Sequence, residues 1–138
     1  MIYFLDTNAA IGFINHRPAI IRERFREARR ANGEFFVSTV VLFELWFGVA
    51  NSGRWQENAA SLRSFLSGNV VTVPFDDEDA RAAAELRDSL HRNGTPIGPY
   101  DVLIAAQALR RNATLVTSNI SEFGLVAGLT CEDWSLPE

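Results

Sequence analysis

Short apolar runs alternate along the chain with longer segments whose apolar residues recur at helical spacing. The first run, residues 2–5, is too short for a helix and lacks the apolar–polar alternation of a half-exposed strand. It therefore predicts a strand buried on both faces, which is typical of parallel sheets covered by helices. Further strands are expected at residues 35–37, 70–73 and 114–117, with a short last one near residues 130–131.

Helices are expected between these strands, at residues 9–14, 18–31, 38–49, 54–66, 76–92 and 102–109. Pro18 should lie in the first turn of the second helix. Trp55 should lie on the buried face of the fourth helix, and Ala80 and Ala84 on that of the fifth. Because strands and helices alternate, the predicted fold class is α/β: a three-layer α/β/α sandwich around a mostly parallel sheet of four to five strands.

The size and composition narrow the class of protein. A chain of 138 residues fits a single domain, here residues 1–138, and its 47% hydrophobic and 22% charged residues are typical of a soluble globular protein. No apolar run approaches the roughly 20 residues of a membrane span, and no secretory signal is expected. The one cysteine, Cys131, suits a reducing compartment, so we expect a cytoplasmic protein.

The charge distribution leaves two interpretations open. The net charge of −4 argues against a general nucleic-acid coat protein. All thirteen basic residues are arginines, and six of them fall within residues 17–30. They could form a solvated helix face partnered by Glu23 and Glu27. Alternatively they could form a local patch that contacts phosphate, which the guanidinium group binds well.

Three acidic residues stand out by their position. Asp6 directly follows the first strand, at the carboxyl end where open α/β sheets place their sites, although it could simply cap the next helix. Glu44 interrupts an otherwise apolar helix, where a buried carboxylate needs compensation, unless it points to solvent. Asp101 follows a loop stiffened by Pro96 and Pro99 and opens an apolar helix, although the helix dipole alone would also stabilise an acid in this first turn.

Asn119 and Glu122 follow the fourth strand, and each alone would be an ordinary loop residue. With the three acids above they would form a cluster of oxygens at one edge of the sheet. Several carboxylates do not stay ionised side by side without a cation. The chain has no lysine, so a hard divalent ion such as Mg²⁺ is the expected neutraliser, and such a site suits hydrolysis of a phosphodiester.

Four segments in this order resemble the PIN-domain ribonucleases, and more closely the VapC toxins of bacterial type II toxin–antitoxin pairs. They are Asp6-Thr7-Asn8, Glu44-Leu45, GTPIGPYDVLIAA at residues 94–106 and LVTSNISEF at residues 115–123. The similarity extends over almost the whole chain and includes Glu132-Asp133-Trp134 near its end. It implies a PIN-like fold.

The resemblance also implies roles for individual residues. Asp6 and Asp101 would hold Mg²⁺ or Mn²⁺, and Glu44 would bind the ion or activate its water. Asn119 stands where many members carry an aspartate, so the fourth acid is open, with Glu122 as the substitute. Thr7 and Ser38 would orient carboxylates by hydrogen bonds.

By the same resemblance, the chain is expected to be an endoribonuclease toxin that cuts tRNA, with the anticodon loop of initiator tRNA as a lead. Its partners would be a VapB-like antitoxin and a second copy of the chain. Trp46 and Phe47 lie in a helix more apolar than one buried face requires, so one of them should touch another chain, although both could belong to the core. The alternative function is a catalytically silent PIN-like module that binds RNA or protein, which the Asn119 departure favours.

Overall fold

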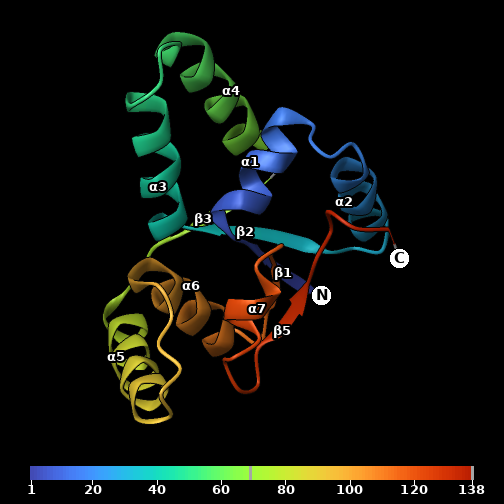
Figure 1. Ribbon diagram of the computed structural model, residues 1–138. Helices are drawn as coiled ribbons and strands as arrows, with labels where there is room; N and C mark the ends of the chain where they lie inside the picture. The colour runs from blue at the N-terminus through green and yellow to red at the C-terminus, as the bar shows by residue number, and fades with distance from the viewer. Residues whose placement is uncertain (69, 138) are drawn as a thin grey trace.

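A five-stranded parallel sheet forms the centre of the computed structural model, which describes residues 1–68 and 70–137 (Figure 1). The strands are β1 (Ile2–Leu5), β2 (Glu34–Ser38), β3 (Val71–Val73), β4 (Thr114–Val116) and β5 (Thr130–Glu132). Their order in the sheet is β3-β2-β1-β4-β5, and every neighbouring pair is parallel. The expected strands are confirmed, and β1 lies in the middle.

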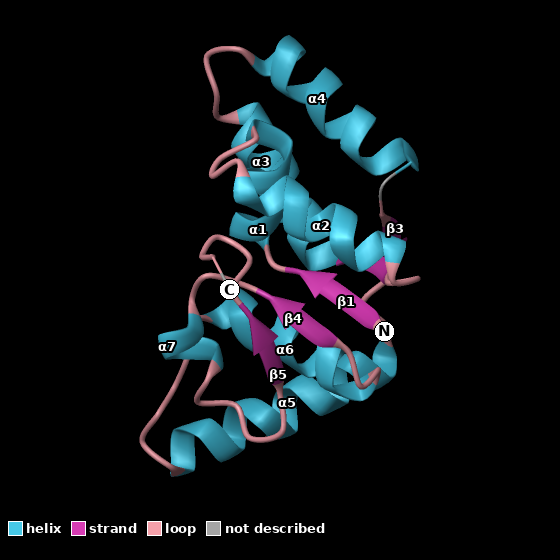
Figure 2. Cartoon of the chain, turned by 90° about the vertical axis from the view of Figure 1, so that its right-hand side faces the viewer, coloured by secondary structure: helices cyan, strands magenta, loops and turns pink. Residues whose placement is uncertain are grey.

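Helices cover both faces of this sheet. Within the described residues they are α1 (Thr7–Asn15), α2 (Ile20–Arg30), α3 (Thr39–Ala50), α4 (Trp55–Gly68), α5 (Asp77–Arg92), α6 (Pro99–Arg110) and α7 (Ile120–Phe123). Figure 2 shows α1 to α4 on one side of the sheet and α5 and α6 on the other, which confirms the three-layer α/β/α sandwich. None of these helices has the length and apolar character needed to cross a bilayer.

The central strand brings the ends of β1 and β4 to the same level. Tyr3, Phe4 and Leu5 are buried, as expected for a strand with helices on both faces. Leu5 pairs with Val116 of β4, and the backbone N–H of the next residue, at position 6, donates to the carbonyl of Val116 at 3.1 Å. Residues that follow these two strands therefore meet at one edge of the sheet, the carboxyl edge.

Three helices begin at this edge because the sequence supplies a start signal at each. Oδ1 of Asp6 accepts from the backbone N–H of Ala9 at 2.8 Å and caps α1. Oγ of Ser38 accepts from the N–H of Val40 at 3.0 Å and caps α3. Pro99 opens α6, where the fixed φ of proline suits the first turn.

Two sequence-based expectations about helix ends are wrong. Pro18 precedes α2, which begins at Ile20, rather than lying in its first turn. Trp55 is 57% exposed rather than buried. The reason for the latter is geometric: Figure 1 shows that α3 and α4 extend well past the sheet, and Trp55 is the first residue of α4, at the far end of this hairpin.

The inner face of α5 also differs from the expectation. Ala80 and Ala84 are exposed, whereas Ala83 and Leu90 are buried together with Asp79. Three successive acids open this helix, at positions 77 to 79, and the pattern of apolar residues alone gave no sign that one of them turns inward.

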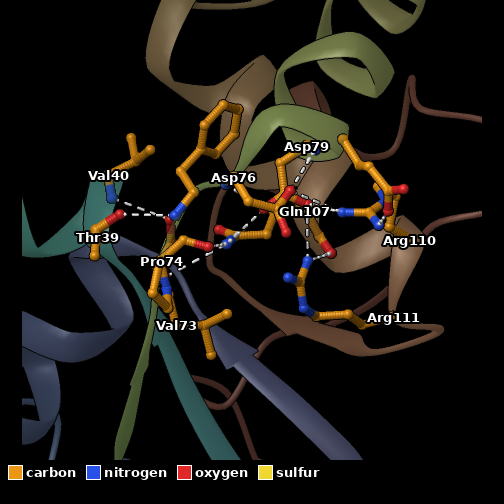
Figure 3. A network of polar contacts seen from close by, with 12 residues as sticks. Thr39, Val40, Val73, Pro74, Asp76, Asp79, Gln107, Arg110 and Arg111 are labelled. Carbon is orange, nitrogen blue, oxygen red and sulfur yellow. Dashed lines mark hydrogen bonds and ion pairs between the residues drawn. The ribbon is translucent and has the colours of Figure 1, made fainter.

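Buried Asp79 is the centre of a polar network that joins α5 to α6 and to the end of β3 (Figure 3). Its Oδ1 accepts from Nη1 of Arg110 at 2.5 Å and Nη1 of Arg111 at 2.9 Å, and its Oδ2 accepts from Nε2 of Gln107 at 3.2 Å. Gln107 also donates to the carbonyl of Pro74 at 3.0 Å. Burial raises the pKa of Asp79, but the hydrogen bond from Arg111 and those from the backbone and Arg110 outweigh it, so the pKa falls to about 2.

Replacing Asp79 by Ala is expected to lower the free energy of unfolding by about 3 kcal/mol at pH 7, because two guanidinium groups lose a buried partner. The folded pKa lies below the ordinary 3.8, so this contribution is present above about pH 4 and is lost as the pH falls towards 2. Urea titrations at pH 7 and pH 3 measure both effects. The exposed neighbour variant Asp77→Ala is the control, and equal losses in the two variants would contradict the assignment.

Candidate active site

Asp6 lies at the carboxyl end of β1 and is only 5% exposed. Besides capping α1, it accepts a hydrogen bond at Oδ2 from Oγ1 of Thr117 at 2.5 Å. Burial raises the pKa of Asp6; the bonds from Thr117 and Ala9 oppose the rise, while the charges of Glu44 and Asp133 add to it. Asp6 is therefore both the helix cap and a member of an acidic group, so the two interpretations of this residue hold together.

Glu44 is half-buried and lies about one and a half turns into α3. Its Oε1 accepts a hydrogen bond from Oγ1 of Thr7, in the first turn of α1, at 2.6 Å. Because α1 and α3 both begin at the carboxyl edge, this bond fixes Glu44 on the side of α3 that faces Asp6. The alternative of a glutamate pointing freely to solvent is wrong.

Glu122, in α7, is held by two donors from neighbouring segments. Its Oε1 accepts from the backbone N–H of Gly98 at 2.7 Å, and its Oε2 accepts from Nδ2 of Asn119 at 3.2 Å. The backbone at Gly98 approaches closely: a Cβ there would lie 2.9 Å from Oδ2 of Asp101 and 3.3 Å from Oε1 of Glu122. The absence of a side chain at Gly98 therefore lets the loop before α6 lie against both carboxyl groups.

Asp101, in the first turn of α6, carries the most strongly perturbed carboxyl group of the site. Burial raises its pKa to about 7, together with a hydrogen bond to Glu122 and the charges of Glu122, Glu44 and Asp6. The pKa of Glu122 is lowered, chiefly by the same bond. Below about pH 7, Asp101 is therefore the protonated partner and donates the hydrogen bond to Glu122.

The structure thus brings together four of the predicted acids, at residues 6, 44, 101 and 122, and assigns Asn119 to the support of Glu122. Thr7 contacts a carboxylate as expected. For Ser38 the structure shows a helix cap rather than a bond to an acid. Thr117 was missed: its hydroxyl bonds Asp6 and also accepts from the N–H of Asn119 at 2.9 Å. Its position directly after β4 was the available signal.

The donor set fits a hard divalent cation. The groups that act on Asp101 most strongly are carboxylates, and oxygen ligands are those that Mg²⁺ and Mn²⁺ prefer. Among the residues that the structure describes, no group of three or more acidic, histidine or cysteine side chains is arranged so that it could hold a metal ion. The hydrogen bond between Asp101 and Glu122 relieves part of the repulsion between these two carboxyl groups.

Two aromatic residues expected at a partner surface differ in exposure. Trp46 is half-buried, and the guanidinium of Arg63 lies 5.4 Å from its ring centre. Phe47 is 63% exposed, so its assignment to the core is wrong, while contact of either residue with another chain stays a prediction.

Several arginines of α2 pack against the protein. Arg22 lies 4.8 Å above the ring of Phe13, and Arg29 lies over the rings of two core phenylalanines. Arg24 donates to the carbonyl of Leu136 at 2.9 Å. These contacts favour a structural role for that part of the basic segment.

Comparison with known proteins identifies the family. The family model described as PIN domain matches residues 3–128. The chain is 38% identical to the tRNA(fMet)-specific endonuclease VapC of Shigella flexneri, over 96% of this chain and 98% of that protein. It is also 38% identical to Ribonuclease VapC2 of Rickettsia felis, over 97% and 98% of the two chains. The chain belongs to the VapC ribonucleases of the PIN-domain family.

Solved VapC structures have the same fold. VapBC2 from Rickettsia felis, bound to a DNA fragment from its promoter, includes a chain with a TM-score of 0.90 and 36% identity, covering 97% of this chain and 99% of that one. DNA-bound VapBC from Salmonella typhimurium gives a TM-score of 0.88 and 35% identity, over 97% and 98%. PIN-domain nucleases are metal-dependent, which agrees with the oxygen-rich site of this VapC-family chain.

Proposed function

We propose that this VapC-family chain is an endoribonuclease toxin that hydrolyses RNA phosphodiester bonds with Mg²⁺, or Mn²⁺ in its place, within one domain formed by residues 1–138. The observation that carries the proposal is the acidic group at the carboxyl edge. Four carboxyl groups come from α3, α6, α7 and the end of β1, and burial together with the hydrogen bond to Glu122 and the charges of the other three raises the pKa of Asp101 to about 7. Such a site favours a divalent cation and, with it, a phosphate group.

In the proposed mechanism Asp6 and Asp101 would hold the cation, and Glu44 would bind it or activate its water. When bound, the cation lowers the pKa of a water molecule and stabilises charge on the attacked phosphate. Thr117 fixes the carboxylate of Asp6, and Thr7 fixes that of Glu44. Attack by water rather than by the ribose 2′-hydroxyl leaves a 5′-phosphate and a 3′-hydroxyl.

The proposed substrate is tRNA, with the anticodon loop of initiator tRNA first. The Shigella flexneri relative is named a tRNA(fMet)-specific endonuclease. A single-stranded loop can splay its nucleotides into an open site, whereas an A-form duplex cannot. Cleavage there would stop translation, and we place the activity in the cytoplasm, where tRNA functions and where the free thiol of Cys131 stays reduced.

The proposed protein partners are a VapB-like antitoxin and a second copy of the chain. The solved structures most relevant here are described as VapBC complexes. The exposed ring of Phe47 on α3 is the side chain we expect at such a contact, with the adjacent Trp46. Antitoxin binding would silence the nuclease until the antitoxin is removed.

A silent RNA- or protein-binding module is the second candidate, favoured by the amide of Asn119 where an acid would otherwise stand. In the proposed enzyme, by contrast, Glu122 supplies the carboxylate that position 119 lacks, and the amide of Asn119 donates a hydrogen bond to it.

Purified protein incubated with initiator tRNA tests the two functions. We expect cleavage in Mg²⁺ at a single loop position, loss of cleavage by about 10²-fold or more when EDTA removes the cation, and recovery when Mg²⁺ is added in excess. Sequencing of the 5′-phosphate ends locates the cut. Cleavage that persists in EDTA would contradict the metal-dependent mechanism, and specific tRNA binding without cleavage would establish the silent module.

A further inference from the structure

Two exposed aromatic side chains directly precede two acids of the site in the sequence. Phe43 precedes Glu44 in α3 and is 55% exposed, and Tyr100 precedes Asp101 in α6 and is 46% exposed. Their ring centres are 5.8 Å apart, with an angle of 53° between the ring planes. The same two helices that present two of the acids therefore also present a pair of aromatic rings that touch each other.

This pair differs from the aromatic pairs of the core. Phe25 and Phe35, for example, stack with their centres 4.1 Å apart, and both are buried. In the pair of Phe43 and Tyr100 the two rings are tilted against each other rather than stacked, and both side chains are exposed. Aromatic surface of this size is favourable to cover, and flat faces are suited to other flat rings.

The position of the pair indicates what would cover it. A phosphate bound at the acids of α3 and α6 would carry a nucleoside on each side, and Phe43 and Tyr100 directly precede two of these acids in the same helices. The net charge of −4 weakens any general attraction for an RNA backbone, so contacts that need no charge gain importance. Stacking of bases on aromatic side chains is such a contact.

We propose that Phe43 and Tyr100 form a stacking platform for one nucleobase next to the scissile phosphate. The inference rests on the proposed ribonuclease function and adds the basis of substrate selection. Because every base has a flat face, the platform selects an unpaired base rather than a particular one. A base within a duplex is already stacked, and so the platform favours single-stranded loops over helical RNA.

Binding of a short single-stranded oligoribonucleotide, followed by fluorescence anisotropy in Mg²⁺, tests the platform. All samples use the full chain with Asp101→Asn, which prevents cleavage, and this chain is the parent in the comparisons that follow. Phe43→Leu and Tyr100→Leu are each expected to weaken binding roughly 10-fold, within the range of losses seen when a stacked base loses its aromatic partner. Tyr100→Phe keeps the ring and is the matched control, with affinity within about twofold of the parent.

Abasic nucleotides, introduced one position at a time, give the decisive measurement. One abasic position is expected to weaken binding to the parent chain roughly 10-fold and to cause little further loss in the leucine variants, because both changes remove the same stacking contact. The abasic measurement on the parent chain needs no substitution at Phe43 or Tyr100, so it remains valid even if a leucine variant fails to fold.

Independent losses, in which the abasic and leucine effects simply multiply, would overturn the platform. So would leucine variants that bind RNA normally but change oligomeric state in size-exclusion chromatography, since the pair would then cover a protein surface. These outcomes are separate from failure of the proposed function, because binding is measured without cleavage. A chain that never cuts RNA refutes the nuclease, whereas uncoupled binding refutes only the platform.

Discussion

The Asp101→Asn variant is expected to lose RNA cleavage by about three orders of magnitude, because a neutral amide neither attracts the cation nor completes its oxygen ligands. The same change should stabilise the fold. In the absence of divalent cations the pKa of Asp101 is raised to about 7 by burial and by the neighbouring carboxylates, so ionising this group opposes folding. Asparagine removes that unfavourable charge while keeping nearly the same shape.

The direction of the pH dependence follows from the same shift. The folded pKa lies above the unfolded value of 3.8, so the folded chain holds an extra proton between about pH 4 and pH 7. Stability of the parent should therefore fall as the pH rises through this window and stay lower above it. The gain in Asp101→Asn should be near zero at pH 4 and about 1 kcal/mol at pH 8, after allowance for solvent screening of a partly exposed group.

Urea titrations in EDTA at pH 4 and pH 8, and cleavage assays in Mg²⁺, measure the two effects of this change. The exposed Asp77→Asn in α5 is the control and should alter neither. An active Asp101→Asn variant would remove Asp101 from the mechanism. If Asp101→Asn were no more stable than the parent at pH 8, the charge of Asp101 would be compensated in some other way.

Glu122→Gln is expected to lower kcat/KM by about 10²-fold, the second-largest effect. Glu122 accepts from Gly98 and Asn119 and is hydrogen-bonded to Asp101, which supports the proposal that it replaces the acid missing at position 119. Glutamine keeps the length of the side chain but removes its charge. The pKa of Asp101 should then fall, because a negatively charged neighbour has been lost.

Exchanging the amide and the carboxylate between residues 119 and 122 tests the role of Glu122 more sharply than a substitution at one of them. In the double variant Glu122→Gln with Asn119→Asp, the amide of one residue can donate to the carboxylate of the other, as in the parent but reversed. We expect part of the lost activity to return, whereas Asn119→Asp alone places two carboxylates in contact and should lower activity. Ser121→Ala, which removes only a hydroxyl near Asn119, is the control. Full activity in Glu122→Gln would contradict the role of Glu122.

The sequence predicted the carboxyl edge correctly because the signals there are local. A short apolar run followed by Asp6, or by Ser38, specifies a strand end and a helix cap within a few residues. Once the strands are parallel, those polar residues must share one edge. The exposed positions of Trp55 and Ala84 could not be predicted in this way, because they depend on how far each helix extends past its neighbours.

The chain by itself therefore determined the alternation of strands and helices, the family, and the edge at which its acids gather. Only the tertiary structure decided which of these groups form hydrogen bonds with one another. Thr117 donates to Asp6, Asn119 donates to Glu122, and Glu122 is hydrogen-bonded to Asp101. It also decided that Asp79 turns inward to two arginines. The physical reason is that helical and strand patterns depend on neighbours in sequence, whereas these hydrogen bonds depend on the order of strands, which places residues 6 and 117 side by side.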